Sequence, residues 1–106
     1  MDDTVREIIV IAKAVIAGET GLAEGSMKLG YLGFQHSNLD HDPDFLPFAA
    51  INSDIGHLPF GSVRENWTSE ALVKADLELR QIEEHYRPTV IEGCKNLIRK
   101  FDKSGV

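Results

Sequence analysis

The chain has 106 residues, which is the usual size of one domain and leaves room for a single hydrophobic core. Its 42% hydrophobic and 26% charged residues are typical of a globular protein and exclude wholesale disorder. The net charge of −6 disfavours nucleic acid and anionic membrane as partners, so we expect one helical domain over residues 1–106 that binds neither.

The first predicted element is an amphipathic helix that ends at Gly18. Its apolar residues recur at steps of three and four, which places them on one face: Val5, Ile8, Ile9, Ala12 and Val15 or Ile16. Thr4 and Glu7 have the spacing of a capping box, in which each side chain binds a free backbone N–H of the other residue. The sequence therefore predicts that Thr4 caps this helix.

A second, weaker helix is predicted from about Thr20 to Gly33, with apolar positions at Leu22, Met27, Leu29 and Leu32. Three glycines, at positions 25, 30 and 33, lower its intrinsic stability by roughly 1 kcal/mol each relative to alanine. No strand precedes them and no Gly-Lys-Ser/Thr follows, so they do not fit a phosphate-binding loop. We expect them to serve turns or close packing against a neighbouring helix.

The stretch 36-HSNLDHDPDF-45 holds two histidines and three aspartates and raises the question of a metal site. The aspartates have the one-three-five spacing that opens a calcium-binding loop: Asp40, Asp42 and Asp44. The sixth position of such a loop is Phe45 instead of Gly, and the twelfth is Ile51 instead of Glu. His36 and His41 are five residues apart, a poor spacing for one helical face, and are only outside candidates for a metal. We expect no metal and no other cofactor.

The dipeptide Asp42-Pro43 is a signal for the start of a third helix. Asp42 can accept hydrogen bonds from free N–H groups, and a proline at the first helical position loses no bond that the helix needs. We expect this helix to cover roughly Pro43 to Ile55, with four positions turned inward: Phe45, Phe48, Ala49 and Ile51 or Asn52. Capping therefore explains much of the aspartate cluster without a ligand.

Residues 56–67 are predicted to be a connection with a short helical turn around Val63 to Asn66. Thr68 then caps the last helix. Trp67, just before this cap, could staple the helix to the core or serve as an anchor for a partner, since tryptophan is enriched at binding hot spots.

The last helix is predicted from Ser69 to about Phe101. Its apolar stripe keeps steps of three or four: Leu72, Ala75, Leu79, Ile82, Tyr86, Val90, Cys94 (or Gly93), Leu97 and Phe101. Charged pairs at four-residue spacing, such as Glu83 with Arg87, are expected on its surface. Because the stripe keeps its phase across Pro88, we expect one kinked helix or two helices nearly in line. The predicted class is all-α, with four to five helices, the shorter N-terminal ones packed on a long C-terminal helix kinked near Pro88.

Other sequence features bear on compartment and catalysis. The longest apolar run, residues 8–12, is far shorter than the roughly 20 residues that cross a bilayer. The chain begins Met1-Asp2-Asp3, acidic where a secretory signal would be basic, and its one cysteine, Cys94, allows no internal disulfide. We therefore expect a cytoplasmic protein. Cys94 lies on the apolar stripe, and no nucleophile elbow or dinucleotide fingerprint occurs, so we expect neither a catalytic residue nor an enzyme.

Three parts of the chain form a motif set: 42-DPDFLPFAAINSD-54, 57-HLPFGSVRENWTSEAL-72, and the region of Glu84, Tyr86-Arg87 and Cys94. They resemble a family of short uncharacterised bacterial proteins that is known only as a domain of unknown function. The resemblance implies no reaction and transfers no catalytic role. Ser69 departs from the family, which often has proline at the first position of this helix; the difference concerns helix initiation alone.

The middle of the chain is acidic, because no Lys or Arg occurs between Lys28 and Arg64. Such a surface would suit a basic partner. We therefore expect a small acidic binding protein with a basic protein partner, in particular an immunity or antitoxin-type inhibitor of a bacterial toxin. The expected contact residues are Asp40, Asp42, Asp44, Asp54, His57, Arg64 and Trp67. Two alternatives stay open: a small metal-dependent enzyme or regulator that uses the His/Asp-rich loop, and a structural homodimer through the C-terminal helix.

Overall fold

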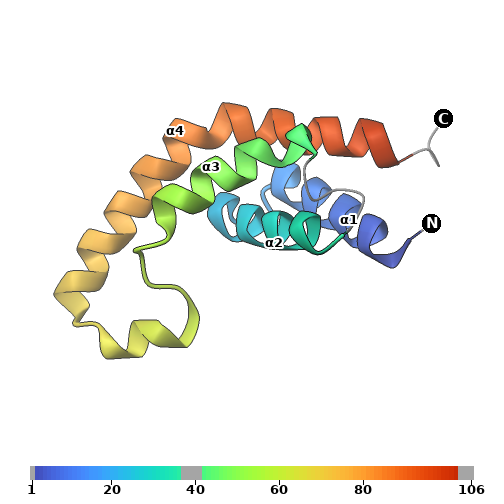
Figure 1. The fold of residues 1–106 in the computed structure, drawn as a ribbon. Helices are drawn as coiled ribbons and strands as arrows, with labels where there is room; N and C mark the ends of the chain where they lie inside the picture. The colour runs from blue at the N-terminus through green and yellow to red at the C-terminus, as the bar shows by residue number, and fades with distance from the viewer. Residues whose placement is uncertain (1, 37–41, 103–106) are drawn as a thin grey trace.

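The computed structural model describes residues 2–36 and 42–102, which form four α-helices and two short 3-10 helices (Figure 1). In chain order they are α1 (Asp3–Ala17), α2 (Leu22–Gln35), η1 (Pro43–Phe45), α3 (Leu46–Ile55), η2 (Gly61–Asn66) and α4 (Ser69–Phe101). The described residues form no strand, which confirms the predicted all-α class. None of their helices has both the length and the hydropathy of a membrane-spanning segment.

The longest element, α4, contacts each of the other α-helices. Figure 1 shows α1, α2 and α3 gathered along the C-terminal half of α4. The N-terminal half of α4 extends beyond them, and the chain that contains η2 turns back beside it. We call this projection, residues 56–80, the arm. It helps to give the molecule its elongated dimensions of 49 × 24 × 21 Å.

Helix α4 runs unbroken across Pro88. Its predicted apolar stripe faces inward, since Val90, Cys94 and Leu97 are fully buried. A proline within a helix lacks the backbone N–H, and its ring crowds the carbonyl four residues earlier, which bends the helix. Figure 1 shows α4 bending in its middle part, so the long C-terminal element is one kinked helix and not two.

Helix α3 and the 3-10 turn before it bury fewer of their residues than the sequence predicts. The side chains of Phe48 and Ile51 are fully buried, as expected. Ala49 is exposed, which contradicts the prediction that it points inward. The next apolar position on the buried face is Ile55, one turn after Ile51, because the 3.6-residue period carries position 49 to the outer side.

Of the three predicted helix caps, two are confirmed and one is wrong. Asp42 accepts from the N–H of Asp44, and Thr68 accepts from the N–H of Ala71, both as expected. The predicted capping box of Thr4 is wrong. Helix α1 begins at Asp3, and Asp2 is its cap, because the Asp2 carboxylate accepts from the N–H of Thr4 over 2.7 Å. An aspartate two residues earlier reaches the free N–H groups, and this places Thr4 inside the first turn.

The glycines of α2 serve close packing. A Cβ atom at Gly25 would lie 2.2 Å from Cγ2 of Val15 in α1. One at Gly33 would lie 2.5 Å from the ring of Phe45 in η1. Both distances are far below a normal carbon–carbon contact, so only glycine lets the neighbouring elements approach this closely. The predicted packing use of these glycines is therefore confirmed.

Candidate functional site

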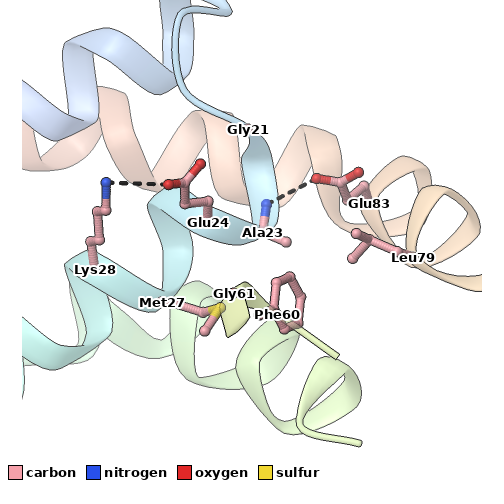
Figure 2. Close-up of a pocket in the computed structure, with 9 residues that line it drawn as sticks. All are labelled: Gly21, Ala23, Glu24, Met27, Lys28, Phe60, Gly61, Leu79 and Glu83. Carbon is pink, nitrogen blue, oxygen red and sulfur yellow. Dashed lines mark hydrogen bonds and ion pairs between the residues drawn. The ribbon is translucent and has the colours of Figure 1, made fainter. Parts of the chain in front are cut away.

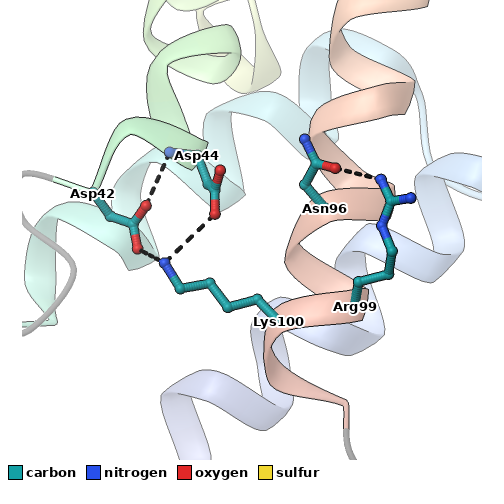
Figure 3. A network of polar contacts seen from close by, with 5 residues as sticks. All are labelled: Asp42, Asp44, Asn96, Arg99 and Lys100. Carbon is teal, nitrogen blue, oxygen red and sulfur yellow. Dashed lines mark hydrogen bonds and ion pairs between the residues drawn. The ribbon is translucent and has the colours of Figure 1, made fainter.

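The acidic residues before α3 pair with the end of α4 (Figure 3). Asp42 accepts from the Asp44 N–H and from the Lys100 ammonium, and Asp44 Oδ2 lies 3.5 Å from Lys100 Nζ. Burial opposes ionisation of Asp42, but the Lys100 ammonium and the Asp44 N–H outweigh it and lower the pKa of Asp42. Arg99 points away from this cluster toward Asn96. Lys100 therefore offsets much of the negative charge that the sequence placed here.

Asp54 and His57 pair with the middle of α4. Tyr86 donates its hydroxyl proton to Asp54 Oδ2 over 2.5 Å, and this hydrogen bond raises the pKa of Tyr86. His57 Nε2 lies 3.0 Å from Glu78 Oε2. Asp54 and His57 are both exposed, so a partner could reach each of them.

Arg64 joins η2 to α4 within the arm. Its two terminal nitrogens donate to both oxygens of Asp76, over 2.9 and 3.0 Å. This fork lowers the pKa of Asp76 and raises the pKa of Arg64. Its geometry holds η2 against α4, which is a structural role. The side chain of Trp67, at the start of α4, is 39% exposed, and both interpretations of it stay open.

The expected contact residues are spread along the length of α4. Those that the structure describes follow one another along α4, from Asp42 beside Lys100 at one end to Arg64 beside Asp76 at the other. Asp40 lies outside the described residues. The use of these residues in binding stays a prediction.

The histidines form no metal cluster within the described residues. In residues 2–36 and 42–102, no group of three or more His, Cys, Asp or Glu side chains could hold a metal ion. His36 Nε2 lies 3.2 Å from Asp2 Oδ2, next to the start of α1. His41 lies outside the described residues. The expectation that the loop holds no metal stays a prediction there.

The Cys94 thiol is fully buried in the core between α4 and the shorter helices. Burial raises the pKa of this thiol from 9.0 to about 11, so it is protonated at neutral pH. The thiolate is the nucleophilic form, and a protonated thiol without solvent access is a poor nucleophile. The environment of Cys94 is that of a small core side chain.

We therefore expect the Cys94 thiol of the native protein to react with an aromatic disulfide reagent at least about 100-fold more slowly than an exposed thiol. In denaturant, one equivalent should react at once. The control is Ser53→Cys, which adds a thiol at an exposed position of α3. The absorbance change of the released thiolate measures both rates. Equal rates for the two thiols in the native protein would contradict the buried position of Cys94.

A pocket with a volume of about 480 Å³ opens between α2 and α4, at the base of the arm (Figure 2). It is lined by Gly21, Ala23, Glu24, Met27, Lys28, Phe60, Gly61, Leu79 and Glu83. Most of its wall is apolar, formed by Met27, Phe60 and Leu79. A volume of this size is in the range of small-ligand sites and could hold one long side chain of a partner. The pocket lies where the arm diverges from α2, so that the side chains of α2, α4 and residues 60–61 leave an open space between them.

The polar groups of the pocket are charged. Glu83 Oε2 accepts from the backbone N–H of Ala23 over 3.0 Å, and so caps the first turn of α2 from a different helix. Gly21, the residue at the cap position itself, has no side chain to do this. At the other side, Lys28 Nζ lies 3.4 Å from Glu24 Oε1. With two carboxylates and one ammonium, the lining carries a net negative charge of one. The pocket therefore combines an apolar wall with acidic groups.

A family model described as "Protein of unknown function (DUF2489)" matches residues 1–97. The chain belongs to this family. The resemblance predicted from the sequence is thereby confirmed, and the match extends over all residues that line the pocket. The comparisons with curated proteins and with solved structures gave no match.

The DUF2489 chain uses Glu83 in a way that spacing along one helix does not predict. The expected pair of Glu83 and Arg87 does not form. Arg87 donates instead to Glu84, three residues earlier, over 2.8 Å. Glu83 is turned toward α2, where it accepts from the N–H of Ala23, 60 residues earlier in the sequence. The one signal in the sequence was Gly21, a helix start without a capping side chain, which calls for an acceptor from elsewhere.

Proposed function

We propose that the protein is a small binding protein that takes an arginine or lysine side chain of a basic partner protein into the pocket between α2 and α4. The observation that carries this proposal is the pocket itself, in which an apolar wall stands next to the carboxylates of Glu24 and Glu83. Long cationic side chains have the same two parts, an aliphatic stem and a charged head.

The stem and the head would find different partners in the pocket. The stem of the incoming side chain would pack on Met27 and Leu79, and Phe60 adds an aromatic face that attracts a cation. The head would meet Glu83, whose Oε1 has no protein partner among the described residues. Hydrogen bonds between charged groups are about twice as strong as neutral ones, so this pair would contribute both affinity and selectivity.

The charge of the whole chain supports the same class of partner. A net charge of −6 attracts a basic protein over long range and speeds association. Within this class we propose an inhibitor of the immunity or antitoxin type, which would bind a basic toxin and cover its active surface. The protein would then act by occlusion, without a reaction of its own and without a cofactor.

A selection of random peptides against the immobilised protein tests the pocket. We expect the selected peptides to share an arginine or lysine beside apolar residues. Glu83→Gln should weaken their binding by about tenfold, because the amide keeps an oxygen that can accept from the Ala23 N–H but removes the charge. Isothermal titration measures the affinity, and the amide resonance of Ala23 reports whether the peptide occupies the pocket.

The matched control is Glu84→Gln, which removes the same charge one residue away on the exposed face, outside the pocket. It should leave the affinity within about twofold of the unchanged protein. Selected peptides without a basic residue would contradict the proposal, and so would equal affinities for the two variants.

A further inference from the structure

Helix α4 carries two large apolar residues on the side opposite its core-facing stripe. Val73 is 69% exposed and Leu77 is 54% exposed, while the core-facing Ala75 between them is buried. Both belong to the arm, which extends beyond α1, α2 and α3 (Figure 1). We call the side chains at positions 70, 73, 77 and 80 the outer face. Their spacing of three, four and three places them in one row along the helix.

The two ends of the outer face carry opposite charges. Glu70 precedes the apolar pair and Arg80 follows it. Both are exposed, and neither forms a close ion pair with another described residue; Arg80 has only a longer-range attraction to Asp76, one turn earlier. The row therefore reads acidic, apolar, apolar, basic, and its charges are placed symmetrically about residue 75.

We propose that the outer face binds the outer face of a second copy of this chain, with the two α4 arms antiparallel and a two-fold axis at the level of residue 75. In this arrangement Val73 of each copy lies opposite Leu77 of the other, because a two-fold interface pairs residue i with j and j with i. Glu70 of each copy then lies opposite Arg80 of the other. The outer face is therefore self-complementary both in its apolar residues and in its charges.

The other contacts of the arm leave this face open. Asp76, which holds η2 through Arg64, lies on the flank of α4, and Val73 and Leu77 stay exposed beside it, so η2 does not cover them. The row has the three-four spacing of a two-helix seam, in which apolar side chains pack into the spaces of the facing helix. Only two apolar residues per copy take part, so the dimer is expected to be weak and to form in a concentration-dependent way. The dimer is independent of the pocket, which lies on a different side of α4.

Charge reversal on the outer face tests this arrangement by sedimentation velocity at low ionic strength, over about 10 µM to 1 mM protein. Glu70→Arg alone and Arg80→Glu alone should each weaken self-association at least about tenfold, because each creates two like-charged contacts per dimer. The double variant Glu70→Arg/Arg80→Glu should restore it, since each copy again offers opposite charges. An equimolar mixture of the two single variants should also associate, as a heterodimer.

Lys95→Glu is the matched control for net charge, because Lys95 is exposed on α4 outside the arm and the change equals that of Arg80→Glu. It should associate like the unchanged protein. Val73→Ser/Leu77→Ser should be monomeric, with an unchanged circular dichroism spectrum because both positions are exposed. An unchanged protein that is monomeric up to about 1 mM would overturn the proposal. So would a double charge variant that stays as weak as the single ones, because only a self-complementary row predicts the rescue.

Discussion

Replacing Phe48 by alanine is expected to lower the free energy of unfolding by about 3–5 kcal/mol. The side chain of Phe48 is fully buried, and its ring packs edge-on against Phe45 at a centroid distance of 6.0 Å. It also lies against Gly93 of α4, where a Cβ atom would come within 3.3 Å of the ring. Removing the ring leaves a cavity between α3 and α4, because the packed helices can shift only partly to fill it. Urea unfolding followed by circular dichroism measures the change.

The control for Phe48→Ala is Leu46→Ala in the same helix, since the side chain of Leu46 is 65% exposed. We expect it to change stability by less than about 0.5 kcal/mol. A domain of this length is stable by roughly 5–15 kcal/mol, so the loss of the Phe48 ring would remove a large part of its stability. Equal midpoints for the two variants would show that Phe48 does not hold α3 on α4.

The sequence predicts well those features that depend on neighbours within a few residues. The apolar stripe of α4 can be predicted because a surface helix buries one face, and the stripe correctly predicts that Val90, Cys94 and Leu97 are buried. The caps at Asp42 and Thr68 were visible for the same reason, since a capping side chain lies within three residues of the N–H that it binds. The prediction was wrong at α1, where the cap is Asp2, two residues before the predicted Thr4.

The candidate site was hidden because its parts are far apart in the sequence. Asp42 lies in a segment without Lys or Arg, but its cation, Lys100, is 58 residues away in the sequence. Asp54 lies in the same segment, and Tyr86, 32 residues later, donates a hydrogen bond to it. The pocket depends on the divergence of the arm from α2, and no local pattern encodes that divergence. Counting charges along the chain therefore overestimates the negative charge of this surface, and it does not predict the pocket between α2 and α4.

Replacing Gly25 by alanine is expected to destabilise the protein, although alanine is the better helix former by about 1 kcal/mol. The new Cβ atom would lie 2.2 Å from Cγ2 of Val15, and a β-branched side chain in a helix has one strongly preferred rotamer. Helices α1 and α2 would have to separate, and overpacking of this kind costs about 1–3 kcal/mol. The steric term therefore exceeds the gain in helix propensity. Urea unfolding again measures the difference.

Two further variants separate the steric term from the propensity term. Gly56→Ala places its Cβ no closer than 3.6 Å to any atom beyond the two neighbouring residues, so this change should be neutral or slightly stabilising. In the double variant Val15→Ala/Gly25→Ala the overlap with Cγ2 is gone, and the loss should be smaller than the sum of the two single losses. If the two losses were simply additive, Val15 would not be the group that Gly25 accommodates. The close approach of α1 to α2 would then have to rest on other contacts, and the glycine at position 25 would have no packing role at this point.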